Sequence, residues 1–126
     1  MKEIPRISEA EWEIMKILWS KAPTTANEVI EVLADNKEWK PATIRSLISR
    51  LLKKNALGFH QDGKTYLYYP LVSEEECIKA ESSSFLRRLY GGALKPMFVN
   101  FLNQEKLTED EVEELKKLLD ERKKKE

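Results

Sequence analysis

Basic side chains gather in the middle of this chain, in numbers suited to the recognition of phosphate groups and base edges. Six lysines and arginines lie between positions 40 and 64, against one acidic residue, Asp62. The whole chain has no formal net charge. Screening nevertheless confines electrostatic fields to roughly 8–10 Å, so a local cluster still attracts phosphate. The cluster therefore favours a nucleic acid as the partner.

The residues that enzymes and metal centres need are scarce. The chain has one cysteine, Cys77, and one histidine, His60, which excludes a disulfide framework and argues against a Cys/His metal site. We find no nucleophile–base set, no phosphate-binding glycine loop and no paired carboxylates on an apolar background. Cys77 is expected to be a small buried hydrophobe, and His60 a surface residue of a strand. The sequence thus predicts no enzymatic activity, metal or cofactor.

Periodicity places the basic cluster on a helix that is followed at once by a hairpin. An apolar stripe at helical spacing predicts a helix from Pro41 to near Asn55; its members are Ile44, Leu47, Ile48 and Leu51. The pair Asp62-Gly63 predicts the turn of a hairpin with arms at 57–61 and 64–69. A helix with a basic, hydroxyl-bearing outer face next to a hairpin is typical of a winged helix that binds DNA.

Capping boxes mark the starts of four helices: Ser8–Glu11, Thr25–Glu28, Ser73–Glu76 and Thr108–Glu111. The first helix is expected to reach about Lys21, and the third box opens a helix that runs to Tyr90, before Gly91-Gly92. A short apolar helix from Ala93 to Leu102 precedes the last box.

These elements predict a mainly α protein with a small β-hairpin wing. Residues 1–72 would form an N-terminal winged helix-turn-helix domain, and residues 73–126 a C-terminal helical dimerisation domain. The second domain is small and rich in large apolar groups, so pairing with a second copy is the economical way to cover them. The alternative is that it packs entirely on its own winged domain. The expected interface residues are Phe85, Leu89, Leu94, Met97, Phe98, Phe101, Leu115 and Leu118.

The expected location is the cytoplasm. No apolar run approaches the 18 or more residues of a membrane span, and the first residues do not read as a signal peptide. We therefore expect no membrane insertion.

The helix from Pro41 to near Asn55 would be the recognition helix, and position along it suggests a role for each candidate DNA contact. Residues early in such a helix usually meet bases and later ones meet phosphate. We expect Thr43, Arg45 and Ser46 at bases or the groove edge, Arg50 at a phosphate, and Lys53, with Lys54, to add diffuse attraction. The alternative is an ordinary solvated helix face.

The hairpin offers a further contact at its turn. Lys64 is expected to touch a phosphate or the minor groove, because Gly63 allows close approach of the backbone. The alternative is a turn lysine that serves only solubility. The pair Tyr66 and Tyr68 is expected to pack the wing on its domain in preference to stacking on bases.

The ordered set of segments resembles the penicillinase repressor family (the BlaI, MecI and CopY group) of winged-helix regulators. The similarity spans positions 4–126 and includes ISEAEWEIMKILW, TANEVIEVL, WKPATIRSLISRLLKK, the wing from Gly63 to Pro70, and SFLRRLYGGALKPMFVNFL. The resemblance implies a homodimeric transcriptional repressor that binds palindromic operators upstream of β-lactamase or methicillin-resistance genes.

The resemblance also implies a way to end repression. In that family a membrane sensor-transducer protease responds to β-lactam, and the repressor is cut in its dimerisation domain. The corresponding bond here is Asn100-Phe101, so β-lactam or cell-wall stress is the expected signal. The copper-responsive branch carries a C-terminal cysteine-rich metal site, and this chain has no cysteine after Cys77.

The chain departs from the family at the start of the recognition helix. The better-known β-lactam members carry Lys where Ala42 stands and Gln where Arg45 stands. Glutamine reads adenine, whereas arginine prefers the O6 and N7 atoms of guanine. An operator that differs from the best-known one is therefore expected.

Two other functions remain open at this point. One is a ligand-sensing winged-helix repressor with an effector pocket near Gly91-Gly92, and the other is a winged helix used as a protein–protein adaptor. The basic outer face of the recognition helix argues against the adaptor, which would be expected to carry apolar or acidic residues there.

Overall fold

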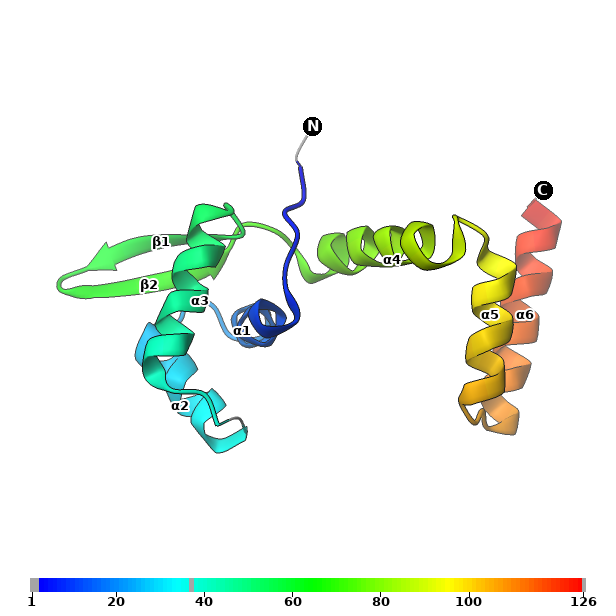
Figure 1. The fold of residues 1–126 in the computed structure, drawn as a ribbon, viewed down its shortest axis with the longest axis horizontal. Coiled ribbons are helices and arrows are strands. Elements are labelled where there is room, and N and C mark those ends of the chain that lie inside the picture. The colour runs from blue at the N-terminus through cyan, green and yellow to red at the C-terminus, as the bar shows by residue number, and fades with distance from the viewer. Residues whose placement is uncertain (1–2, 37, 126) are drawn as a thin grey trace. The chain divides into compact units, whose positions relative to one another are not determined.

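Six helices and one two-stranded sheet make up the described residues, 3–36 and 38–125, of the computed structural model (Figure 1). The elements are α1 (Glu9–Ser20), α2 (Ala26–Asn36), α3 (Pro41–Lys53), β1 (Leu57–Asp62), β2 (Thr65–Pro70), α4 (Glu74–Tyr90), α5 (Leu94–Gln104) and α6 (Glu109–Lys125). They form two compact units, Met1–Ser82 and Ser83–Glu126. The predicted fold class, mainly α with a β-hairpin wing, is confirmed.

Side-chain caps begin the helices where the sequence predicts them. The Ser8 hydroxyl accepts a hydrogen bond from the Glu11 N–H at 3.1 Å, and the Ser8 N–H donates to the Glu11 carboxylate at 2.8 Å. The same reciprocal pair joins Ser73 to Glu76 and Thr108 to Glu111. Each box gives a hydrogen-bond acceptor to two backbone N–H groups that would otherwise lack a partner at the start of the helix.

A single hydrophobic core fills the first unit. It consists of one side each of α1, α2 and α3, closed by the start of β1 and by residues near the start of α4: Ile7, Ile14, Met15, Leu18, Val29, Leu33, Ile44, Leu47, Ile48, Leu51, Ala56, Leu57, Val72 and Cys77. The predicted stripe of α3 is buried in full. Trp12, Trp19 and Trp39 pack against this core, and the Trp19 indole donates to the Val72 carbonyl at 2.9 Å.

The turn of the hairpin lies one residue later than predicted. Asp62 pairs with Thr65, so the two loop residues are Gly63 and Lys64 and not Asp62 and Gly63. Gly63 has φ +67°, and Lys64 does not have a positive φ, which is the pattern of a turn that needs glycine only at its first loop position. Lys64 therefore lies in the turn itself and not in the second arm of the hairpin.

Backbone hydrogen bonds attach the hairpin to the helices. Thr24, in the segment before α2, exchanges two bonds with Tyr68 of β2, at 3.0 and 2.8 Å. The Leu71 N–H donates to the Ala56 carbonyl at 2.8 Å, which closes the base of the hairpin. Away from this base the hairpin projects beyond the helices of its unit (Figure 1).

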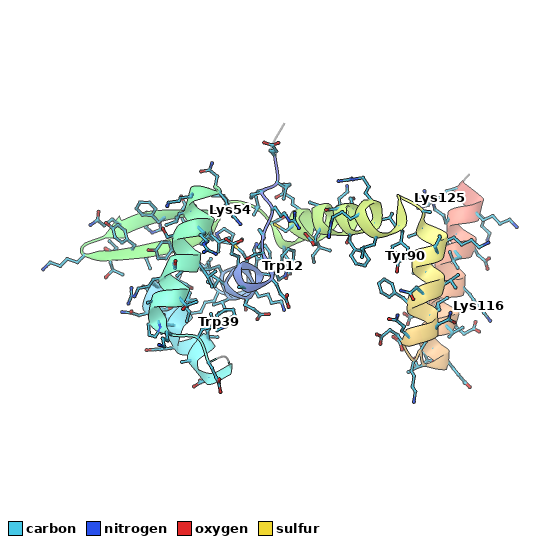
Figure 2. All side chains as sticks on the ribbon, viewed as in Figure 1. Trp12, Trp39, Lys54, Tyr90, Lys116 and Lys125 are labelled. Atoms are coloured by element: carbon cyan, nitrogen blue, oxygen red, sulfur yellow. The ribbon has the colours of Figure 1, made fainter. Side chains whose placement is uncertain are left out.

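An ion pair between a buried carboxylate and a partly exposed ammonium holds the chain before α1 to the end of α3. The Glu11 side chain is 1% exposed, and its carboxylate pairs with the ammonium group of Lys54, which also donates to the Arg6 carbonyl at 2.9 Å. Lys54 lies at the C-terminal end of α3 (Figure 2). We expected Lys54 to add diffuse attraction for DNA. Its partly exposed ammonium is paired with Glu11 and bound to the Arg6 carbonyl, so less of its charge is available to attract phosphate.

The Glu11 carboxyl has a lowered pKa because its partners outweigh its burial. Burial alone raises the pKa, while the hydrogen bond from Lys54, the bonds from Ser8 and the positive charge of Lys54 lower it. The ionised form is therefore the stable one at neutral pH.

The second unit has no comparable core. None of the described residues 83–125 is buried. Glycines end α4 where the sequence predicts: Gly91 and Gly92 have φ +58° and +86°, and their N–H groups donate to the Arg87 and Leu86 carbonyls. No helix in the described part of the chain is long and apolar enough to cross a membrane.

The ion pair generates a stability prediction. Lys54→Met is expected to lower the free energy of unfolding by about 1–3 kcal/mol at pH 7, because it leaves the buried Glu11 carboxylate without its partly exposed cation. The matched control is Lys53→Met, which removes an exposed lysine from the preceding position and should change stability by less than about 0.5 kcal/mol. Chemical denaturation measures both.

The stability that the Glu11–Lys54 pair contributes should depend on pH in a definite direction. A carboxyl whose folded-state pKa lies below its ordinary value of 4.5 stabilises the fold above that pH and loses the contribution as the pH falls. In Lys54→Met, protonation of the Glu11 carboxyl removes the cost of burying an unpaired charge. The difference in unfolding free energy between the variant and the parent should therefore narrow from pH 7 to pH 4. A gap that stays constant would contradict the role given to Lys54.

Candidate nucleic-acid interface

Three of the predicted DNA contacts lie together on the outer face of α3. Thr43, Ser46 and Arg50 are exposed and, with Ala42 and Leu47, line a hollow of about 370 Å³. The helical spacing puts Ser46 opposite the buried stripe, and it puts Thr43 and Arg50 on one flank of the stripe, next to Leu47. Two hydroxyls and a guanidinium on one open helix face can donate to base edges and phosphates.

Arg45 lies at a second hollow, between α3, the start of α2 and the hairpin. This hollow, of about 180 Å³, is lined by Thr25, Ala26, Asn27, Arg45, Lys64, Thr65, Tyr66 and Tyr68. The Nη2 atom of Arg45 donates to the side-chain oxygen of Asn27 at 3.0 Å. The structure thus brings Arg45 and Lys64, predicted on separate elements, to the same depression.

Lys53 lines neither hollow. Its side chain is exposed at the last residue of α3, which suits the diffuse attraction predicted for it. Lys64 is exposed in the hairpin turn. Both can approach a polyanion without losing an internal partner that the structure describes.

Aromatic residues stiffen one face of the hairpin. The rings of Phe59 and Tyr66 meet edge to face with centroids 5.1 Å apart, and Tyr68 is 6.4 Å from Phe59. Tyr68 packs against the core of the first unit, which agrees with the packing role expected for it. Tyr66 is 45% exposed and borders the second hollow.

Sequence reasoning missed the contribution of α2. Thr25 and Asn27 both line the second hollow, and the Thr25 hydroxyl caps α2 by accepting from the Glu28 N–H at 3.2 Å. The capping box could have placed Asn27 in the first turn of α2. Its contact with Arg45, which lies 18 positions later, leaves no local signal.

The lone cysteine and histidine take the places expected of them. Cys77 is 2% exposed within the core, and His60 is exposed on β1, with its ring 5.9 Å from that of Tyr69. Among residues 3–36 and 38–125, no three potential ligand side chains stand close enough to hold a metal ion.

The residues predicted for dimerisation lie on α4, α5 and α6, within the second unit. Leu89, Leu94 and Leu118 are about three-fifths exposed, at 60%, 58% and 60%. Phe85, Met97, Phe98 and Leu115 are half-buried.

The predicted cleavage bond lies inside α5, and residues of α4 hold both of its side chains. Asn100 donates to the Tyr90 hydroxyl at 2.8 Å and accepts from Gln104 at 3.2 Å. Phe101 stacks on Phe85 with ring centroids 6.1 Å apart. Tyr90 lies at the end of α4, just before the turn into α5 (Figure 2).

Comparison with known proteins agrees with this geometry. The family described as Penicillinase repressor matches residues 7–121. The chain is 42% identical to a penicillinase repressor of Bacillus licheniformis over 98% of its own length and 96% of that protein. It is 42% identical to the methicillin resistance regulatory protein MecI of Staphylococcus aureus, over 90% and 92% of the two chains.

One solved structure of a relative is a complex with a half-operator. The Bacillus licheniformis BlaI monomeric form in complex with the blaP half-operator matches with a TM-score of 0.53 and 42% identity, over 60% of this chain and 93% of that one. The multidrug-efflux regulator MepR of Staphylococcus aureus matches with a TM-score of 0.53 over 94% of this chain, but at 18% identity this supports the fold alone. The chain belongs to the penicillinase repressor family, and it is a DNA-binding transcriptional repressor and not an enzyme.

Proposed function

We propose that the protein is a homodimeric repressor of a palindromic operator, released when a membrane sensor-transducer protease cuts Asn100-Phe101 after β-lactam or cell-wall stress. The observation that carries the DNA part is the convergence of Arg45, on α3, and Lys64, in the hairpin turn, at one hollow. A relative of 42% identity is known in complex with a half-operator, which supports one winged unit per half-site. The winged unit would comprise residues 1–72, and the dimerisation domain residues 73–126, with Cys77 at the start of α4 packed into the core of the first unit.

The two basic residues divide recognition between them. Arg45, in the second turn of α3, is placed for the major groove, where arginine favours guanine. Lys64 carries a point charge at the hairpin turn and meets a phosphate or the minor groove. Thr43 and Ser46 accompany Arg45 in reading base edges, while Arg50 and Lys53 contact the backbone.

Dimerisation follows from the apolar surface of the second unit. Large side chains on α4, α5 and α6 stay exposed although none of the described residues 83–125 forms a buried core. A second copy covers such a surface by two-fold pairing of identical helices. The dimer then presents two winged units to a palindrome, and the linked half-sites add to the affinity.

Release by proteolysis requires α5 to open first. Proteases act on locally unfolded chain, so the rate follows the population of the open form when opening is rapid. The contacts of Asn100 with Tyr90 and of Phe101 with Phe85 oppose that opening. Cutting the bond separates α6 from the rest of the dimerisation domain and favours monomers, which bind half as many phosphates.

The division of labour between Arg45 and Lys64 can be tested on operator variants. Arg45→Ala is expected to reduce discrimination at one base pair of each half-site by about tenfold, because a bidentate contact is lost. Lys64→Ala should weaken binding to all sequences alike and make the salt dependence shallower by about one unit. Fluorescence anisotropy across a salt series measures both effects. Uniform losses in both variants would remove base reading from Arg45.

The dimer interface can be tested at a side chain that the single chain leaves open. Leu118→Asp is expected to raise the dimer dissociation constant at least about tenfold, since it places a charge in the apolar interface. Lys117→Asp changes the neighbouring position to the same residue and should preserve the dimer. Analytical ultracentrifugation compares the two variants. A dimer of unchanged strength in Leu118→Asp would move the interface away from α6.

The opening step can be tested with thermolysin, which cuts before large apolar residues. Tyr90→Phe removes the hydroxyl that accepts from Asn100, and it should raise the rate of cleavage at Asn100-Phe101 by about three- to tenfold, as expected for the loss of one hydrogen bond. Tyr66→Phe removes a hydroxyl from the hairpin and should leave that rate unchanged. Mass spectrometry of the fragments identifies the bond, and equal rates in all three proteins would exclude Tyr90 as a restraint.

A further inference from the structure

One polar contact joins the first turn of α2 to the recognition helix. The Nη2 atom of Arg45 donates to the side-chain oxygen of Asn27 at 3.0 Å, between residues 18 positions apart. Both residues are exposed and border the hollow that also contains Lys64. The contact therefore lies on the surface proposed to face DNA.

The position of Asn27 is fixed by the structure around it. Thr25 caps α2 through its hydroxyl, and Thr24 is bound to Tyr68 of the hairpin by two backbone hydrogen bonds. The ammonium of Lys21, at the end of α1, lies 3.6 Å from the carboxylate of Glu28, in the first turn of α2. Asn27 thus stands on a segment that is anchored to the hairpin and packed against α3.

The side chain of Arg45, in contrast to Asn27, has much conformational freedom to lose. An exposed arginine has several rotatable bonds, and ordering its side chain costs up to about 2 kcal/mol. A fixed acceptor that holds the guanidinium before DNA arrives reduces this cost at the moment of binding. Asn27 is placed to be that acceptor.

The contact leaves the guanidinium free to read a base. A guanidinium has five N–H donors, two of them on Nη2. Asn27 engages one Nη2 hydrogen, so the other can still join a hydrogen of Nη1 or Nε in a two-pronged bond to guanine O6 and N7. Support by Asn27 and recognition of guanine are therefore compatible.

We infer that Asn27 is a positioning residue for sequence specificity: it holds Arg45 in the orientation that reads a G·C pair of the operator. The inference rests on the proposed base-reading role of Arg45. Asn27 acts through Arg45 and need not touch a base itself. Operator preference in this chain then depends on a pair of residues from two helices.

The test compares specificity ratios, in which effects common to all sequences cancel. The protein variants are Asn27→Ala, Arg45→Ala and the double variant, with Glu31→Ala, an exposed change on the same helix, as the control. Each full-length protein is used to select from DNA with randomised half-sites, and affinities are then measured on the selected site and its single-base-pair variants. Thermal denaturation checks that the variants stay folded.

Asn27→Ala is expected to lower preference at the base pair that Arg45 reads by about fivefold, as for the loss of one hydrogen bond. It should have no further effect on preference in the Arg45→Ala background, because the two residues act as a unit. Asn27→Asp retains the acceptor oxygen, so it should preserve the preference even though its negative charge weakens binding to all DNA. Glu31→Ala should leave the preference unchanged.

Other results would overturn the inference in distinguishable ways. If Arg45→Ala leaves preference intact, the base-reading role itself fails. If Arg45→Ala alters preference and Asn27→Ala only weakens all sequences equally, Asn27 contacts the backbone and positions nothing. If Asn27→Ala binds more tightly with unchanged preference, the contact is a restraint that DNA must break.

Discussion

The two backbone hydrogen bonds between Thr24 and Tyr68 are the constraint on which the proposed DNA-binding surface depends. A two-stranded hairpin alone is marginally stable in water, and within residues 3–36 and 38–125 this one has no third strand. The bonds join it to the segment that begins α2, while α2 packs against α3. Helix, capped turn and hairpin are thereby held as one body, and Arg45 and Lys64 reach the same hollow although they come from different elements.

The parts of the fold set by local chemistry could be predicted. Serine and threonine caps, the apolar stripe of α3 and the glycines after Tyr90 each act within a few residues, and the helices begin and end close to where these signals lie. The hairpin turn was misplaced by one residue because Asp62-Gly63 and Gly63-Lys64 both suit a two-residue loop. The pairing of Asp62 with Thr65 across the two strands makes Gly63-Lys64 the loop.

The polar contacts that complete the site could not be predicted from local patterns. Glu11 meets Lys54 across 43 positions, and Asn27 meets Arg45 across 18. Glu11 reads as an ordinary capping-box residue, and Lys54 as one more member of a basic cluster. Only the packing of α1 against α3 reveals that one lysine of the cluster serves the fold. Its neighbour Lys53 stays exposed, so the sequence overstates the charge available to DNA.

The distribution of buried residues bears on how repression can end. Every member of the core of the first unit lies at or before Cys77, whereas the proposed cleavage bond lies in α5 and is flanked by exposed or half-buried side chains. A cut there would remove none of the residues that hold α3 and the hairpin together. The winged unit would stay folded and competent for a half-site. Loss of repression would then come from the lost link between two half-sites, whose combined affinity greatly exceeds that of either one.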